Sequence, residues 1–212
     1  MKKLDTLKLF CKYDGARFFT ENPVYQTIDG IKCVVATDCH IVIICRNLEG
    51  LGDNITLSID YPNFNGVVPK ENCCELLNVN KLKDALDRIP IVDYEEIECD
   101  ECAGIGIVSF EYRAGNGVLY SKDCDCPICS GDGFSRRYGV KSRDNSYYID
   151  FYGVIVKQKY INILYKALSD LRIEKIPYLV LKDEKKIMLK NEDYTIILMG
   201  VKNCKTNVIK IL

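Results

Sequence analysis

The feature that most constrains this chain is a short cysteine motif that occurs twice. Cys99-Asp-Glu-Cys102-Ala-Gly-Ile-Gly106 is followed by Cys126-Pro-Ile-Cys129-Ser-Gly-Asp-Gly133. Two CxxC turns can direct four thiolates at one small cation, and the glycines let the backbone turn back toward the sulfurs. Zinc accepts four sulfurs tetrahedrally and brings no redox chemistry. The spacing therefore predicts one zinc ion held by Cys99, Cys102, Cys126 and Cys129.

Other interpretations of these cysteines are open at this point. The pattern could arise by chance, or the thiols could pair as disulfides, and Cys124 is a candidate fifth or substitute ligand. Four sulfur ligands leave no coordination position for water or substrate. The zinc ion is therefore expected to be structural and not catalytic.

The repeated CxxCxGxG motif resembles the zinc-binding repeat of DnaJ-type co-chaperones. That family carries four copies that form two sites, whereas this chain has two copies and no His-Pro-Asp signature of a J-domain. The resemblance implies a local metal geometry. A role in holding unfolded chains would need an exposed apolar groove, which the sequence does not reveal.

Length and composition indicate an ordinary globular protein. The 212 residues are 48% apolar and 28% charged, which suits one domain or one domain with an insert. The formal net charge of −1 gives no global basic field, so any nucleic-acid contact must come from a local patch. No apolar run is long enough for a membrane span, and the scattered cysteines suit a reducing compartment. We expect a cytoplasmic protein with no membrane contact.

Hydrophobic periodicity predicts two helices among antiparallel strands. One apolar stripe indicates a helix that begins at a cap, Asn80, and ends before Pro90, and a second indicates a helix from about Lys157 to Leu171. Alternating or β-branched runs predict strands at 7–11, 31–37, 41–46, 55–59, 91–98, 105–113, 178–182, 185–190, 194–201 and 208–212.

Several stretches resemble the bacterial DNA sliding clamp, the DNA polymerase III beta subunit. Ala36-Thr-Asp-Cys-His-Ile-Val42 is similar to the Ala-Thr-Asp-Gly-His-Arg-Leu of that family and also lies between two apolar strands. The segment from Tyr61-Pro-Asn-Phe to Val68-Pro69 resembles its Phe-Pro-Asp-Tyr to Leu-Pro connection. The predicted second helix and the stretch Ile197-Leu-Met-Gly-Val201 resemble a clamp helix and the family's Leu-Met-Pro stretch.

The resemblance implies an α+β fold of antiparallel sheets with two helices on one face, a sliding-clamp-like domain carrying a small zinc-binding insert. We expect residues 1–95 to form the first part of this domain, 96–145 the inserted zinc lobe and 146–212 the second part. Clamp chains hold three such domains and this chain has material for about one. A ring would need several copies of the chain in a homo-oligomer, and a monomer or small oligomer that shares the fold is an equal alternative.

In the clamp family, the threonine, the histidine and the following apolar residue of this motif line a pocket for short motifs of polymerases and repair proteins. By position, the resemblance assigns partner binding to Thr37, His40 and Val42, with wall residues Pro69 and Met199. Cys39, Ile41 and Gly200 depart from the family's Gly, Arg and Pro. A simpler interpretation of His40 is a side chain that caps the turn by hydrogen bonds.

A basic segment follows the second cysteine pair. Guanidinium groups can bind phosphate and interleaved aromatic rings can stack on bases, although such charges often form only a solvated surface. Lysines on the two predicted helices could add phosphate contacts if both helices share a face. The predicted nucleic-acid-binding residues are Arg136, Arg137, Lys141, Arg143, Lys81, Lys83, Lys159 and Lys166.

The sequence gives little support for an enzyme. It has a single histidine and lacks a GxSxG motif, a P-loop and a dinucleotide fingerprint. We predict a non-enzymatic accessory protein of DNA transactions that binds DNA, replication or repair partners, or both. The alternative is an interaction module or scaffold that binds partner peptides through the zinc lobe and the ATDCH pocket. Salt dependence separates them, because phosphate binding weakens steeply with salt.

Overall fold

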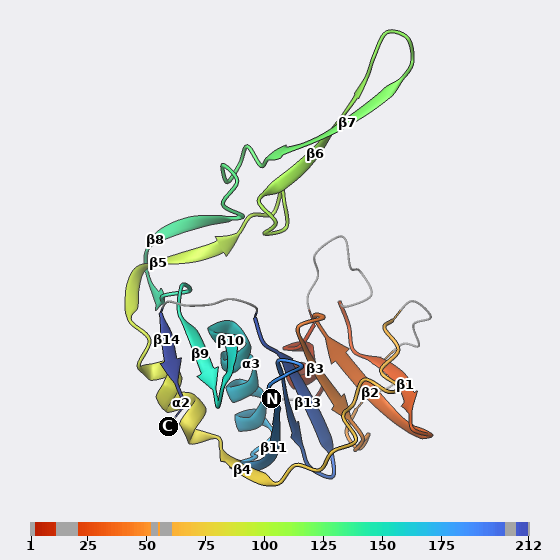
Figure 1. Cartoon of the computed structure of the whole chain (residues 1–212), viewed down its shortest axis with the longest axis vertical. Helices are drawn as coiled ribbons and strands as arrows, with labels where there is room; N and C mark the ends of the chain where they lie inside the picture. Colours follow the sequence, from red (N-terminus) through yellow and green to blue (C-terminus); the bar gives the residue numbers. More distant parts are fainter. Residues whose placement is uncertain (1–2, 12–20, 52–54, 56–60, 202–206, 212) are drawn as a thin grey trace. The chain divides into compact units, whose positions relative to one another are not determined.

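The computed structural model describes residues 3–11, 21–51, 55, 61–201 and 207–211. The chain forms two compact units. We call residues 1–89 with 145–212 the core unit, and residues 90–144 the cysteine unit. In the described residues the sheets are mostly antiparallel, and three helices accompany them (Figure 1).

A seven-stranded antiparallel sheet forms the centre of the core unit. Its order is β1-β2-β3-β13-β12-β11-β4, so three strands from the start of the chain meet three from its end at the β3–β13 pair. The strands are β1 (Val24–Ile28), β2 (Ile31–Thr37), β3 (Ile41–Cys45), β13 (Tyr194–Met199), β12 (Lys186–Lys190), β11 (Lys175–Leu181) and β4 (Glu75–Asn78).

Both faces of the central strands are covered. The helices α1 (Lys3–Lys8), α2 (Asn80–Asp87) and α3 (Gln158–Asp170) share one hydrophobic core with alternate residues of the sheet. Every residue of β3 is buried, because alternate residues face the core shared with the helices and the residues between them face a second hydrophobic cluster that includes Tyr61 and Phe64. This second cluster places the 61–68 segment against the opposite face of the sheet.

A smaller sheet completes the core unit. It contains β9 (Tyr148–Phe151), β10 (Val154–Lys157) and β14 (Val208–Lys210) in the order β10-β9-β14. The β14–β9 pair is parallel. Ile149 and Phe151 of β9 are fully buried in the same core as the helices.

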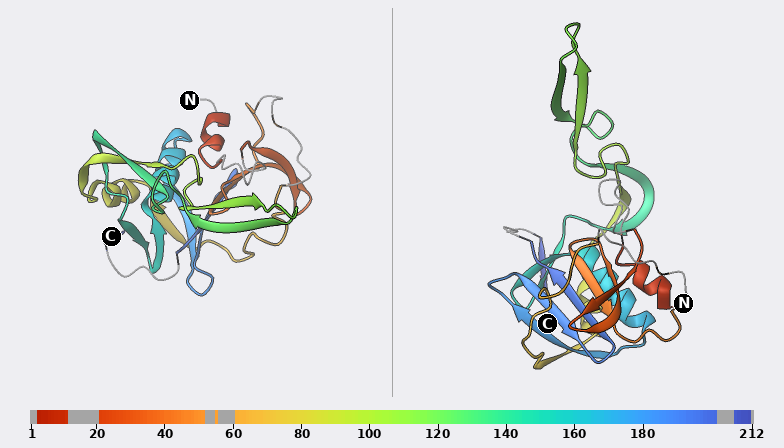
Figure 2. Two further views of the ribbon diagram at one scale, coloured as in Figure 1. Left: turned by 90° about the horizontal axis from the view of Figure 1, so that it is seen from above. Right: turned by 90° about the vertical axis from the view of Figure 1, so that its right-hand side faces the viewer.

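The cysteine unit consists of two antiparallel ribbons and the loops that carry the four predicted ligands. β5 (Ile91–Glu98) pairs with β8 (Phe134–Arg143), and β6 (Ile107–Arg113) pairs with β7 (Leu119–Asp125). Figure 2 shows both ribbons from two further directions. Each ribbon is a sheet of two strands.

The structure corrects several local predictions. The expected strand at 7–11 is wrong: α1 covers Lys3–Lys8 and a turn reaches Cys11. Leu7 and Phe10 are both fully buried, a spacing of three that is helical, while the alternation of Leu7 and Leu9 suggested a strand. The core unit thus has a third helix beyond the two expected.

Asn80 is the first residue of helix α2 and does not cap it. The side chain of Asn78 instead accepts the N–H of Asn80 at 3.0 Å. Of the strand expected at 55–59, residues 56–59 lie outside the described residues. No described helix is long and apolar enough to cross a membrane.

The core makes a direct prediction about stability. Leu164 of α3 is fully buried, so Leu164→Ala should lower the free energy of unfolding by about 2–5 kcal/mol through lost burial and a cavity. Lys166→Ala, two residues along the same helix and exposed, should change it little. Urea unfolding followed by circular dichroism measures both. Equal stability of the two variants would contradict the packing described.

Candidate functional site

The four predicted ligands come together in the cysteine unit. The Sγ atoms of Cys99, Cys102, Cys126 and Cys129 all lie within 4.8 Å of one another. Each cysteine is at most 7% exposed. The Cys99–Cys126 and Cys102–Cys129 sulfurs are 3.8 and 3.7 Å apart, so each close pair joins the two motifs. Four converging thiols are a donor set that fits one tetrahedral zinc ion.

Each motif makes the same two kinds of hydrogen bond, one within itself and one to the other motif. The N–H of Gly106 donates to Cys102 Sγ at 3.2 Å, and the N–H of Gly133 donates to Cys129 Sγ at 3.1 Å. The carbonyl of Gly133 accepts the Cys99 N–H at 2.9 Å, and the carbonyl of Gly106 accepts the Cys126 N–H at 2.8 Å. Each motif therefore orients a ligand of its own and a ligand of the other.

The last glycine of each motif has no room for a side chain. A Cβ on Gly133 would lie 2.5 Å from the carbonyl oxygen of Gly104, and a Cβ on Gly106 would overlap the carbonyl oxygen of Gly131. Both glycines also have a φ near +79°, where other residues are strained. The spacing CxxCxGxG is thus required by backbone contact between the two motifs as well as by the ligands.

Thiol ionisation also favours a cation at this centre. Burial raises the pKa of the Cys102 thiol, but the Gly106 N–H and the neighbouring thiols lower it by more, to about 7. Burial and then the neighbouring thiols raise the pKa of Cys129 to about 11 despite the N–H of Gly133. The Cys102 thiol therefore loses its proton more readily than the Cys129 thiol beside it. Four thiolates in contact need the positive charge of a bound metal.

Cys124 is not part of this cluster. It lies on β7, half-buried, and its Sγ is 3.8 Å from the carbonyl oxygen of Val108. None of the described residues adds a fifth ligand to the cluster of four.

An apolar pocket of about 210 Å³ lies in the core unit at the turn between β2 and β3. It brings together four of the five residues assigned to partner binding: Thr37, His40, Val42 and Met199. Pro69 is not among its lining residues. The segment that precedes Pro69 lines the pocket instead, through residues that the sequence analysis did not assign to partner binding: Pro62, Phe64 and Val67.

Hydrogen bonds fix the shape of this turn. Asp38 Oδ1 accepts the N–H groups of His40 and Ile41 at 2.9 and 3.0 Å, and Thr37 Oγ1 donates to the carbonyl of Ile41 at 2.7 Å. Cys39 has a φ of 71°, the left-handed region that glycine adopts at little cost. The turn therefore keeps a glycine-type backbone although a cysteine occupies the position.

Strand β13 contributes Ile197 and Met199 to the pocket lining. The N–H of Met199 donates to the carbonyl of His40 at 2.9 Å, which holds the end of β13 against the turn. The next residue, Gly200, donates its N–H to the carbonyl of Lys185 at 2.7 Å. A proline here would have no N–H for that bond. The imidazole ring of His40 lies 5.7 Å from the ring of Tyr160 on α3.

The predicted nucleic-acid-binding residues are divided between the two units. Arg136, Arg137, Lys141 and Arg143 all lie on β8 of the cysteine unit. Arg137 forms an ion pair with Glu95, and Arg136 Nε is 3.7 Å from Glu96. The register of β5 with β8 places these residues directly opposite one another. The two glutamates lie on a different strand, β5, so the sequence around the arginines did not indicate these ion pairs.

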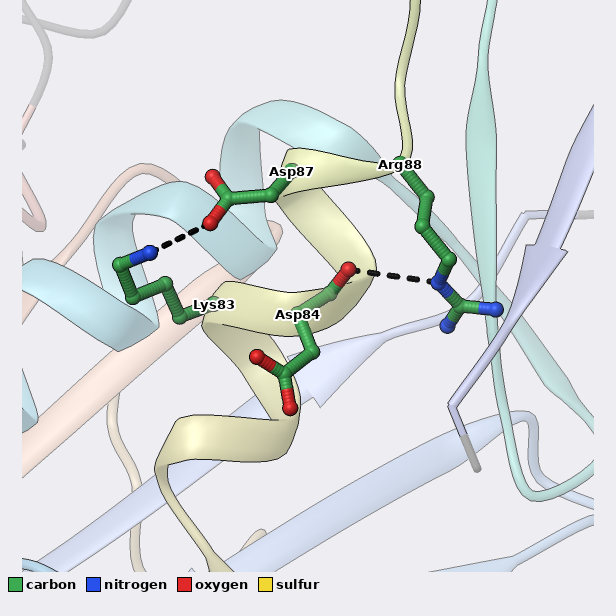
Figure 3. A network of polar contacts seen from close by, with 4 residues as sticks. All are labelled: Lys83, Asp84, Asp87 and Arg88. Atoms are coloured by element: carbon green, nitrogen blue, oxygen red, sulfur yellow. Dashed lines mark hydrogen bonds and ion pairs between the residues drawn. The ribbon is translucent and has the colours of Figure 1, made fainter.

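The helix lysines belong to the core unit. Lys81 and Lys83 are exposed on α2, and Lys159 and Lys166 are exposed on α3. Lys83 forms an ion pair with Asp87 at 2.5 Å, and Arg88 Nε donates to the carbonyl of Asp84 (Figure 3). Lys159 lies over the ring of Tyr160 with its Nζ 4.9 Å from the centroid.

The two units carry opposite formal charges. The cysteine unit has eleven acidic and six basic residues, a balance of −5. The rest of the chain has nineteen acidic and twenty-three basic residues, a balance of +4.

The fold is that of the sliding clamps. A DnaN sliding clamp (DNA polymerase III subunit beta) from Bartonella birtlesii, solved bound to griselimycin, matches with a TM-score of 0.50 and 12% identity. DNA polymerase III, beta subunit, from Thermotoga maritima matches with a TM-score of 0.51 and 9% identity. Both comparisons cover 95% of this chain but only 63% of the clamp. No family model and no curated protein matches the sequence.

The interlocked glycines predict an effect on metal affinity. Gly106→Ala should weaken zinc binding by about 10–100-fold, because the added Cβ displaces the backbone that donates to Cys102 Sγ. Gly117→Ala is a matched control: its φ of +83° is similar, but nothing lies within 4 Å of the added Cβ. Competition with a chromogenic chelator measures both affinities. Equal zinc affinities of the two variants would show that the contact between the motifs is unimportant.

The ligand set itself is tested by cysteine replacement. Cys99→Ser should reduce bound zinc well below one ion per chain and unfold mainly the cysteine unit. Cys124→Ser should keep one ion per chain, because Cys124 lies outside the cluster. Elemental analysis of the purified proteins gives the stoichiometry. Full zinc content in Cys99→Ser, or loss of zinc in Cys124→Ser, would contradict the assignment.

Proposed function

We propose that this protein is a non-enzymatic accessory factor of DNA transactions whose core unit binds a short apolar segment of a replication or repair protein. The observation that supports this most directly is the pocket at the turn between β2 and β3. Its lining includes Thr37, His40, Val42 and Met199, the positions that the clamp resemblance assigned to partner binding.

The size and chemistry of the pocket favour side chains of a peptide over a free metabolite. Its volume of about 210 Å³ is below the roughly 300–1,000 Å³ of typical small-molecule sites. Its walls include Val67, Ile197 and Met199, and Lys186, the one lysine among its described lining residues, is paired with Glu184 at 2.7 Å. Such a site can bury one or two large apolar side chains while the rest of the peptide stays on the surface.

The proposed role of zinc is structural. The four cysteines, with the half-buried Val108 against them, are the hydrophobic cluster of the cysteine unit. A unit of this size cannot gain enough stability from so small a core. One zinc ion bound to Cys99, Cys102, Cys126 and Cys129 would supply the missing cross-links, and its four sulfur ligands leave no open position for catalysis.

Direct DNA binding is the second candidate, and the charge of the core unit favours it. This part of the chain has a formal balance of +4, and Lys81, Lys159 and Lys166 are exposed on its helices. On β8, Arg136 and Arg137 remain predicted contacts. Both already face a carboxylate, so a phosphate would have to compete with Glu96 and Glu95.

The pocket is tested with a labelled decapeptide that carries an adjacent Leu-Phe pair between polar residues. Met199→Glu should weaken its binding at least about tenfold, because the variant places a charge in an apolar wall. Ile31→Glu, a change at another exposed apolar residue of the core unit outside the pocket, should bind normally. Fluorescence anisotropy reports the dissociation constants.

Salt separates the two candidates in the same assay. Peptide affinity should change little between about 50 and about 500 mM salt, whereas affinity for duplex DNA should fall steeply. A peptide that binds Met199→Glu and the wild-type protein equally, or a peptide without the apolar pair that binds as well, would contradict the proposal.

A further inference from the structure

The β6–β7 hairpin of the cysteine unit has two chemically different faces and no third strand. Its register places residues of equal parity on the same face, because side chains alternate across a strand. Within the described residues, β6 and β7 pair only with each other. Both outer edges of the hairpin therefore present unpaired backbone N–H and C=O groups (Figure 1).

One face is aromatic. Tyr112 lies opposite Tyr120 and their rings stack at 6.0 Å, while Phe110 lies opposite Lys122. Phe110, Tyr112 and Tyr120 are 56%, 63% and 53% exposed. Three large rings side by side in solvent form a contiguous apolar surface of the kind that marks an interaction site.

The other face carries three carboxylates, interspersed with the exposed apolar residues Ile107 and Leu119. Glu111 lies opposite Ser121, and Ser109 lies opposite Asp123 with a hydrogen bond between their side chains. Asp125 follows on the same face. Its only basic residue in either strand is Arg113, at the end next to the turn. The face thus adds to the −5 balance of the whole unit.

We propose that the outer edge of β6 accepts an extended segment of a partner protein as a third strand, with basic and apolar residues alternating along it. Alternation would place the apolar side chains beside Phe110 and Tyr112 and a basic side chain beside Glu111. The edge would supply backbone hydrogen bonds, and the added strand would cover a two-stranded ribbon that is marginal by itself. β6 is preferred over β7 because it carries two of the three rings, Phe110 and Tyr112, whereas Lys122 interrupts the aromatic side of β7.

Two other occupants fit less well. A second copy of the chain paired edge to edge would bring identical acidic faces together, and two strands of seven residues offer far less than the roughly 800 Å² per partner of a stable interface. Single-stranded nucleic acid could stack on the rings, but its phosphates would meet a unit of net negative charge.

The test uses the full zinc-loaded chain and a labelled nine-residue peptide in which lysine alternates with valine or phenylalanine. This peptide should bind at least about tenfold tighter than a peptide of the same composition with its lysines grouped. Methylation of alternate backbone nitrogens should abolish the preference, because it removes the donors that pair with the edge. Hydrogen exchange should slow at the amides of β6.

Matched variants locate the site. Tyr112→Ser and Glu111→Lys should each weaken binding at least about tenfold. Tyr138→Ser, which removes another exposed ring of the same unit, and Asp93→Lys, which makes the same charge change on β5, should not. The Met199→Glu variant should bind this alternating peptide normally, so a negative result for the hairpin would leave the pocket proposal untouched. The zinc content of each variant shows whether the cysteine unit has folded; Phe110→Ser replaces Tyr112→Ser if the latter loses zinc.

Three results would overturn the proposal. The grouped peptide could bind as well as the alternating one, or the control variants could lose as much affinity as the hairpin variants. Alternatively, oligothymidine or a second copy of the chain could occupy the same residues, as shown by competition with the peptide or by light scattering of wild-type and Tyr112→Ser protein.

Discussion

The pairing of β3 with β13 is the interaction on which the rest of the core unit depends. It joins Ile41–Cys45 to Tyr194–Leu198, from opposite ends of the chain, and every one of these residues is buried. The pair completes the seven-stranded sheet and places Met199 against the turn that contains His40. The pocket is therefore a product of long-range pairing. The same pairing lets the cysteine unit interrupt the chain between these strands without entering the sheet.

The cysteine unit is stabilised in a different way. Its ribbons are largely exposed, and its buried cluster consists of the four cysteines. Four converging thiols and the contacts between the glycines occupy the centre of this unit in place of apolar side chains, so removal of the proposed zinc ion should affect the two units differently. The two units also have opposite formal charges, so a basic core unit and an acidic cysteine unit should attract different partners.

Sequence patterns anticipated the features that depend on short spacing. Each CxxC pair, the helix that became α3 and the turn at Asp38 follow from residues that are close together in the sequence, and the repetition of the CxxCxGxG motif indicated that the two pairs meet. Features set by non-local register were missed. Glu95 and Glu96 reach Arg137 and Arg136 only through β5–β8 pairing, and Phe64 and Val67 replace Pro69 in the pocket because of how one segment packs on the sheet. The strand predicted at 7–11 failed because short helical and alternating patterns coincide there.

The central claim is that the pocket between the β2–β3 turn and β13 binds an apolar peptide. The most direct measurement is a methyl NMR spectrum of protein labelled at isoleucine, valine and methionine, recorded during titration with the Leu-Phe decapeptide. The account predicts saturable shifts at Ile41, Val42, Val67, Ile197 and Met199, which line the pocket, and unchanged signals at exposed methyls elsewhere, such as Ile31 and Ile128. Unshifted pocket methyls at saturating peptide, or shifts confined to the cysteine unit, would contradict it.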